Sequence, residues 1–183
     1  PYPATWTSFT TFSISVPLTH QVNVLAFAGR DRLGNPVPGM TDTITVTYNG
    51  VIQEPQDYVV INELHYNPAE PQTGFIELHN RSTSTPFNLS GFRLEGVGYT
   101  LPEGTIIPAN GYLVIAGNAA AFATHYGGGI PLVGEFPGRL DNDGETIRLV
   151  KPGATPEQDV RITDLRYYDR LPWPVNADGF GPS

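Results

Sequence analysis

The chain has 183 residues, which is enough for one large domain or two small ones. It contains 20 glycines and 18 prolines but only 15% charged residues, so we expect an all-β fold of short strands joined by tight turns. The net charge is −8 and no basic cluster is present to replace phosphate counterions, so nucleic acid is not expected as a main partner.

Three further absences narrow the class of protein. No apolar run approaches the roughly 18 residues of a membrane-spanning helix, so we expect no transmembrane segment. The first residues lack the basic-then-apolar order of a secretion signal, and we expect the sequence to be a piece of a longer mature protein. The chain has no cysteine, which excludes disulfides and thiolate metal sites.

The first fifty residues alternate between apolar and polar side chains, which predicts β-strands. We expect strands at residues 11–18, 21–29 and 42–50, with a loop at residues 29–39. The strand at 21–29 carries apolar side chains on both faces at its end, as a central strand would.

The run "VNVLAFAGRDRLGNPV", followed by "ITVTYNG", resembles the C-terminal half of a bacterial immunoglobulin-like domain. The resemblance implies that residues 1–52 are the last strands of such a domain, whose front strands lie outside the sequence. Residues 53–58 would then be a linker.

A second unit is predicted from residue 59 onward. Strands are expected in "VVINELHY", "GFIELHN", the segment around Phe92 and Leu94, the run from Tyr112, and "DVRITDLRYYD". The apolar phase of the last of these slips between Ile162 and Leu165, which predicts a bulge or bend there.

One helix and one hairpin turn are predicted in this unit. In "NAAAFATHYGGG", Asn118 can cap the helix, Phe122 and Tyr126 are spaced to stack, and a glycine follows to end it. In "LDNDGETIRLVKPG", Asp143-Gly144 predicts a two-residue hairpin turn.

The second unit resembles the lamin tail domain of the bacterial type. Six pieces occur in the expected order: "VVINELHYNP", "GFIELHN", "FNLSGFRLEG", "LPEGTIIPANGYLVIAGN", "LDNDGETIRLVKPG" and "YYDRLPWPVNADGFGPS". Phe92 stands where the family usually has tryptophan. The resemblance implies that residues 59–183 form an immunoglobulin-like β-sandwich, with the partial immunoglobulin-like unit before it.

The resemblance also implies a setting. Bacterial members usually occur inside large exported proteins, so we expect an extracellular or cell-envelope location and, as partners, other domains of the same polypeptide and a protein or carbohydrate ligand. The expected role is a non-catalytic spacing or binding module without a cofactor. The alternative is an accessory domain of a secreted nuclease, phosphatase or spore-coat-type kinase. Nuclear lamins carry this domain behind a coiled-coil rod, but this sequence has no heptad repeat. We therefore do not expect it to assemble into filaments.

The tripeptide Glu-Leu-His occurs twice, as Glu63 to His65 and Glu77 to His79. Period 2 places each Glu and His on one face of its strand, with the leucines turned to the core. We expect the four polar side chains to form a surface patch that faces solvent or a neighbouring domain. Two other interpretations remain open: a zinc site, and with it a metal-dependent enzyme, or a structural hydrogen-bonding role for the glutamates.

Alternate carboxylates at Asp141, Asp143 and Glu145 could hold calcium, but the spacing of an EF-hand is absent, and turn chemistry alone explains these residues. No motif of a hydrolase, metalloprotease, phosphate loop or dinucleotide site occurs.

The ending "YYDRLPWPVNADGFGPS" places rigid aromatic side chains beside polar groups. We expect it either to dock a ligand or to close one end of the sandwich with Trp173, and we favour closure because a small domain gains much from burying tryptophan. The candidate ligand-binding residues are Tyr167, Tyr168, Asp169, Arg170, Trp173 and Asp178.

Overall fold

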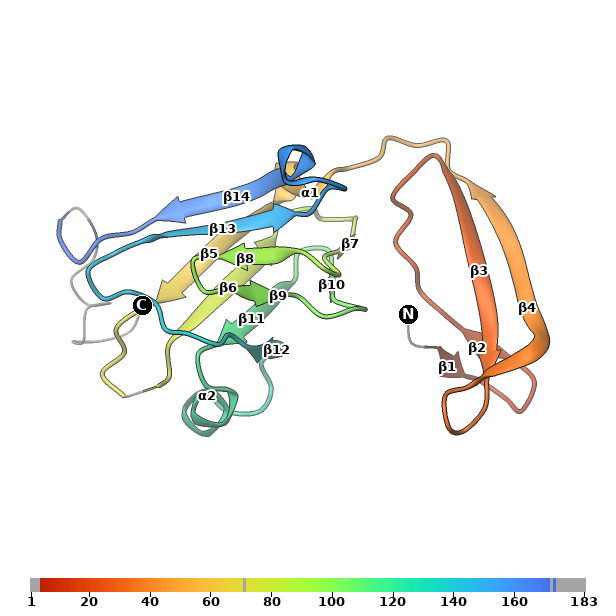
Figure 1. Cartoon of the computed structure of the whole chain (residues 1–183), viewed down its shortest axis with the longest axis horizontal. Helices are drawn as coiled ribbons and strands as arrows, with labels where there is room; N and C mark the ends of the chain where they lie inside the picture. The colour runs from red at the N-terminus through yellow and green to blue at the C-terminus, as the bar shows by residue number, and fades with distance from the viewer. Residues whose placement is uncertain (1–3, 71, 172, 174–183) are drawn as a thin grey trace. The chain divides into compact units, whose positions relative to one another are not determined.

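A computed structural model describes residues 4–70, 72–171 and 173 of the chain. Most of the described secondary structure is β-strand (Figure 1). The chain divides into two compact units, one formed by residues 15–53 and the other by the remaining residues. Each is described by itself below.

The N-terminal residues form a small hairpin of β1 (Thr5–Trp6) and β2 (Phe12–Ser13). Its turn is fixed by Ser8, whose hydroxyl accepts hydrogen bonds from the backbone N–H groups of Thr10 and Thr11. The predicted strand at residues 11–18 is therefore wrong beyond Ser13, where the chain leaves the β-pairing.

The unit of residues 15–53 is one long hairpin of β3 (Val22–Arg30) and β4 (Pro36–Thr47). The predicted loop at 29–39 is shorter than expected, because Asp31 closes a tight turn. Its carboxylate accepts hydrogen bonds of 2.8 Å from the backbone N–H groups of Leu33 and Asn35, and these bonds lower its pKa. Within the described residues β3 pairs with β4 alone, so it is not the central strand we expected.

The larger unit contains two four-stranded sheets (Figure 1). The first has the order β12-β11-β6-β5. Its strands are β5 (Val59–His65), β6 (Phe75–Asn80), β11 (Tyr112–Ala116) and β12 (Leu132–Glu135). The second has the order β14-β13-β8-β9. Its strands are β8 (Arg93–Glu95), β9 (Tyr99–Thr100), β13 (Thr146–Lys151) and β14 (Val160–Arg166). β7 (Phe87–Asn88) and β10 (Ile106–Ile107) pair with each other in a separate two-stranded sheet.

The core lies between the two sheets. Alternation turns Ile76 and Leu78 of β6 inward, and Leu94 and Leu149 meet them from the other sheet; all four are fully buried. Burial of such side chains contributes about 1.5–3 kcal/mol each. The architecture is the immunoglobulin-like β-sandwich that the sequence predicted.

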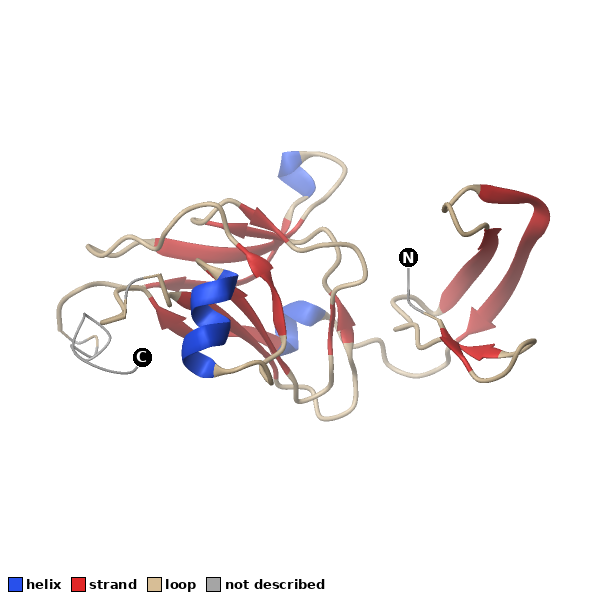
Figure 2. Ribbon diagram, turned by 90° about the horizontal axis from the view of Figure 1, so that it is seen from below, coloured by secondary structure: helices blue, strands red, loops and turns tan. Residues whose placement is uncertain are grey.

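Helix α2 (Ala119–Tyr126) covers part of the outer face of the first sheet (Figure 2). It forms where predicted: the side chain of Asn118 accepts a 2.8 Å hydrogen bond from Ala121 N, and the helix ends at Gly127 with φ of 89°. Phe122 is buried against Phe75, so a second apolar cluster lies under the helix.

Two short helices were not predicted. Helix α1 (Pro55–Tyr58) lies within the expected linker; Pro55 is buried and Tyr58 packs on the core, so these residues belong to the sandwich. A 3-10 helix (Pro156–Gln158) joins β13 to β14. Beside it, Arg93 forms an ion pair with Asp159, whose pKa is lowered by the Gly153 backbone N–H and by this arginine.

The predicted bulge is confirmed. Val150 pairs with Arg161 and Leu149 with Thr163, so Ile162 is the extra residue on β14 and turns into the core. The predicted hairpin turn at Asp143-Gly144 is wrong. A turn closes from Gly144 N to Asp141 O, but the strand before it, β12, belongs to the first sheet and does not pair with β13.

Candidate functional site

The two glutamates of the repeated tripeptide face each other. Glu63 pairs with Glu77 across β5 and β6, and Asn62 donates a 2.7 Å hydrogen bond to the Glu77 carboxylate. Partial burial and, after it, the charge of Glu77 raise the pKa of Glu63. The pair is thus a strained like-charge contact on the outer face of the sheet.

The two histidines are held separately. His65 is buried beneath α2, with Nδ1 3.0 Å from the Tyr126 hydroxyl and its ring edge against Phe75. His79 instead stacks on Tyr112 of the neighbouring strand at 4.2 Å. The prediction of a solvent-facing patch is wrong for His65, because the helix covers that end of the sheet. Among the described residues no group of three or more His, Asp or Glu side chains is arranged to hold a metal.

Two of the three alternate carboxylates build a turn. Asp141 accepts a 3.0 Å hydrogen bond from Asp143 N, and Glu145 accepts one of 2.8 Å from Asp141 N. Glu145 also accepts a bond of 3.1 Å from the hydroxyl of Tyr167, which donates in addition to the Asp141 carbonyl at 2.8 Å. Two of the calcium candidates, Asp141 and Glu145, are therefore engaged in local structure.

Tyr167 is fully buried, and its ring lies against Tyr66 at 4.8 Å between centroids. Burial and the nearby Glu145 carboxylate raise its pKa well above the ordinary value, so the hydroxyl keeps its proton. Its ring lies in the core and is not exposed for docking. This residue anchors the turn at Asp141 to the core of the sandwich.

The other candidate docking residues lie nearer the surface. Tyr168 is half-buried, with the guanidinium groups of Arg166 and Arg170 at 5.1 and 5.7 Å from its ring centre. Asp169 and Arg170 are exposed. Trp173 is half-buried and packs against the core, the contact that closure of the sandwich end requires. Asp178 lies outside the described residues.

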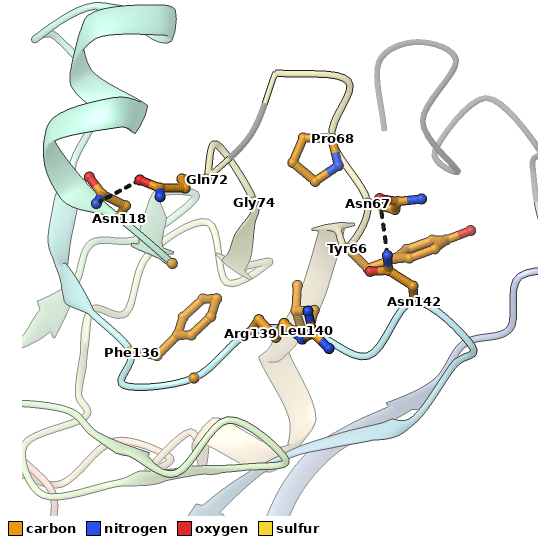
Figure 3. A pocket seen from close by; sticks show the side chains of 12 residues that line it. Tyr66, Asn67, Pro68, Gln72, Gly74, Asn118, Phe136, Arg139, Leu140 and Asn142 are labelled. Atoms are coloured by element: carbon orange, nitrogen blue, oxygen red, sulfur yellow. Dashed lines mark hydrogen bonds between the residues drawn. The ribbon is translucent and has the colours of Figure 1, made fainter.

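A cavity of about 530 Å³ opens at the end of the sandwich where β5 ends and β6 begins (Figure 3). We call it the amide cavity. Three loops line it, with residues 66–68, 72 and 74 from the first, 117–118 from the second, and 136, 138–140 and 142 from the third. Buried Tyr66, Phe136 and Leu140 give it an apolar floor. Its volume falls within the range of small-molecule sites, about 300–1,000 Å³.

Amide side chains form its rim in two bonded pairs, seen on opposite sides in Figure 3. Asn118 donates to Gln72 Oε1 at 3.3 Å, and Asn142 donates to Asn67 Oδ1 at 3.2 Å. Gln72 holds a φ of 70°, a left-handed conformation that residues other than glycine rarely adopt. Such strain often marks a functional loop.

The sequence analysis did not identify the amide cavity. Its rim residues come from three loops and share no motif, so periodicity cannot bring them together. Two residues that the sequence analysis did single out hold the rim of this cavity in place. Asn118 caps α2, and Tyr167 anchors the turn that carries Asn142. One weak signal was present in the sequence: Asn67 and Asn118 each lie two residues after the end of a strand.

The fold places the chain in a structural class, the immunoglobulin-like β-sandwiches. The model of the lamin tail domain family matches residues 53–168, and the chain belongs to this family. Comparisons with curated proteins and with solved structures gave no significant match.

The match starts at residue 53, so it includes α1 and the segment we expected to be a linker. Among the described residues, no helix is both long and apolar enough to cross a membrane.

Proposed function

We propose that this chain is a binding module of a larger exported bacterial protein, and that it holds a protein or glycan ligand in the amide cavity while spacing the domains beside it. The observation that carries the proposal is the cavity itself, with an apolar floor and a rim of ordered amides. A few placed polar groups around an apolar floor are typical of ligand sites.

The cavity is preorganised for binding, because the residues around it are held in place without a ligand. Its floor residues belong to the core, and its rim amides are bonded to each other before any ligand arrives. Preorganised groups lose little conformational entropy on binding. The loops can therefore present a fixed surface to a partner.

Filling the cavity tests the proposal. Gly138 lines it and has room for a side chain, since a Cβ there meets only Val97 O at 4.0 Å. Gly138→Trp should abolish binding to whichever glycan or peptide the wild-type chain captures on arrays. Gly128→Trp is the matched control, because that glycine lies in open space outside the cavity.

Equal binding by wild type and Gly138→Trp, with both proteins folded by circular dichroism, would refute the cavity as the binding site. Retained binding by Gly128→Trp shows that an added tryptophan does not itself interfere.

The exported setting rests on the resemblance of residues 1–52 to an immunoglobulin-like domain directly before a lamin tail domain. An antibody against residues 53–168 should detect the parent protein in the envelope or medium of fractionated source cells. Detection confined to the cytosol would contradict it. Sequencing the parent gene would decide between this role and that of an accessory module beside a catalytic domain.

A further inference from the structure

This inference rests on the proposed function. The chemistry of the amide cavity restricts the class of ligand that the cavity can bind. Each rim amide offers both an acceptor oxygen and an NH₂ donor. Hydroxyl groups also donate and accept, so a ring bearing several hydroxyls can satisfy such a rim from all sides. The apolar floor suits the C–H face of the same ring.

Two rim groups have capacity for a ligand. Gln72 Nε2 and Asn142 Oδ1 have no hydrogen-bond partner among the described residues, whereas their opposite atoms are bonded across the rim. Both side chains are exposed. They stand on opposite sides of the cavity (Figure 3), so a ligand between them would meet a donor on one side and an acceptor on the other.

The size of the cavity, about 530 Å³, favours a compact unit. Its lining residues come from three separate loops and not from one strand edge, whereas an extended peptide would need a groove or a free strand edge. A single sugar unit at the end of a glycan chain fits this shape.

The charge of the lining is the third observation. Arg139 is the charged side chain among the described lining residues, it is exposed, and it forms no ion pair with any described residue. A chain of net charge −8 that leaves an arginine uncompensated at a cavity offers a local attraction for a carboxylate.

We propose that the amide cavity binds an acidic sugar unit of the uronic acid class, its hydroxyls on the rim amides and its carboxylate on Arg139.

Titration calorimetry with D-glucuronic acid, D-glucose and sodium acetate tests this directly. The wild-type chain should bind glucuronic acid at least about 10-fold more tightly than glucose, the difference expected for one added charge-assisted hydrogen bond. Acetate should bind more weakly still, because it lacks the ring. Arg139→Gln should reduce glucuronic acid to the affinity of glucose, and Arg139→Lys should retain part of the preference.

Gly138→Trp separates failure of this inference from failure of the proposed function. If the arrays show peptide binding that Gly138→Trp abolishes, while neither sugar binds, the cavity is a ligand site and the acidic-sugar assignment is overturned. Equal affinity for glucose and glucuronic acid, or no change in Arg139→Gln, would also overturn it. Arg139 has no described partner, so the Gln and Lys variants should fold normally.

Discussion

Glu63 and Glu77 place two carboxylates opposite each other on neighbouring strands, and this contact has a measurable pH dependence. The pKa of Glu63 is raised, so the folded chain holds that proton more tightly than the unfolded chain does. The resulting stabilisation is fully present below the ordinary value of 4.5 and is lost as pH rises through the raised pKa.

Glu63→Gln should therefore unfold at higher urea concentration than wild type at pH 7, and the difference should shrink at pH 4. The glutamate is partly solvated, so we expect an effect of about 0.2–1 kcal/mol. Glu103→Gln, at an exposed position, is the control. A constant difference between the Glu63→Gln and wild-type curves at both pH values would show that the carboxylate pair contributes no such dependence.

For single residues, the sequence predicted which side chains share a strand face better than it predicted what covers that face. The pairing of Glu63 with Glu77 follows from two adjacent strands. The burial of His65 does not, because the helix that covers it lies more than fifty residues further along the chain. Period 2 within a strand shows which side chains share a face, but not what covers that face.

Among the elements, the turn from Asp141 to Gly144 controls one wall of the amide cavity. Gly144 has a φ of 100°, and a Cβ there would overlap the carbonyl oxygen of Tyr167. Gly127, at the end of α2, has a similar φ of 89° but nothing within 4 Å of such a Cβ. Substitution of Gly127 thus introduces backbone strain alone, whereas substitution of Gly144 introduces both backbone strain and steric overlap.

Gly127→Ala should lower the free energy of unfolding by about 1–3 kcal/mol, the cost of a strained conformation. Gly144→Ala should lower it by about 1–3 kcal/mol more, because the overlap is added. Urea titrations followed by tryptophan fluorescence measure both. Equal losses in the two variants would mean that the turn moves freely away from Tyr167.

Local signals determined which elements were predicted correctly. Helix α2 depends on Asn118, Gly127 and the pair of Phe122 with Tyr126, all within ten residues. The bulge at Ile162 was visible as a slip of phase. The hairpin at Gly144 failed, because a turn-forming dipeptide does not specify which strands it connects, and β12 joins the other sheet.

For the whole molecule, the two units differ in how they are stabilised. Every buried apolar residue among the described ones lies between Pro55 and Tyr167. The hairpin of residues 15–53 leaves Val22, Val24 and Met40 about 60% exposed. A two-stranded hairpin is marginally stable by itself in water.

A fragment of residues 53–183 should therefore melt cooperatively, within a few degrees of the full chain. A fragment of residues 15–53 should show no cooperative transition. Differential scanning calorimetry on the two fragments and the intact chain gives both results. A cooperative transition in the shorter fragment would show that the hairpin has a source of stability beyond the contacts described.

The sequence resemblance located the lamin tail unit because its first five pieces follow one another along a single core. The first fifty residues were harder to predict. Alternation indicated the strands, but it did not show that β3 would have one neighbour, since partners are set by tertiary pairing. The amide cavity required the folded arrangement of three loops.

The hydroxyl of Tyr167 has one more consequence. It never meets a ligand, yet it fastens the Asn142 turn to the interior through the Asp141 carbonyl and Glu145. The geometry of the proposed binding site and the resistance of the fold to unfolding thus depend on the same oxygen atom. Laboratory evolution for tighter ligand binding should enrich variants in which these hydrogen bonds of Tyr167 are held more rigidly. The same variants should also unfold at higher temperature.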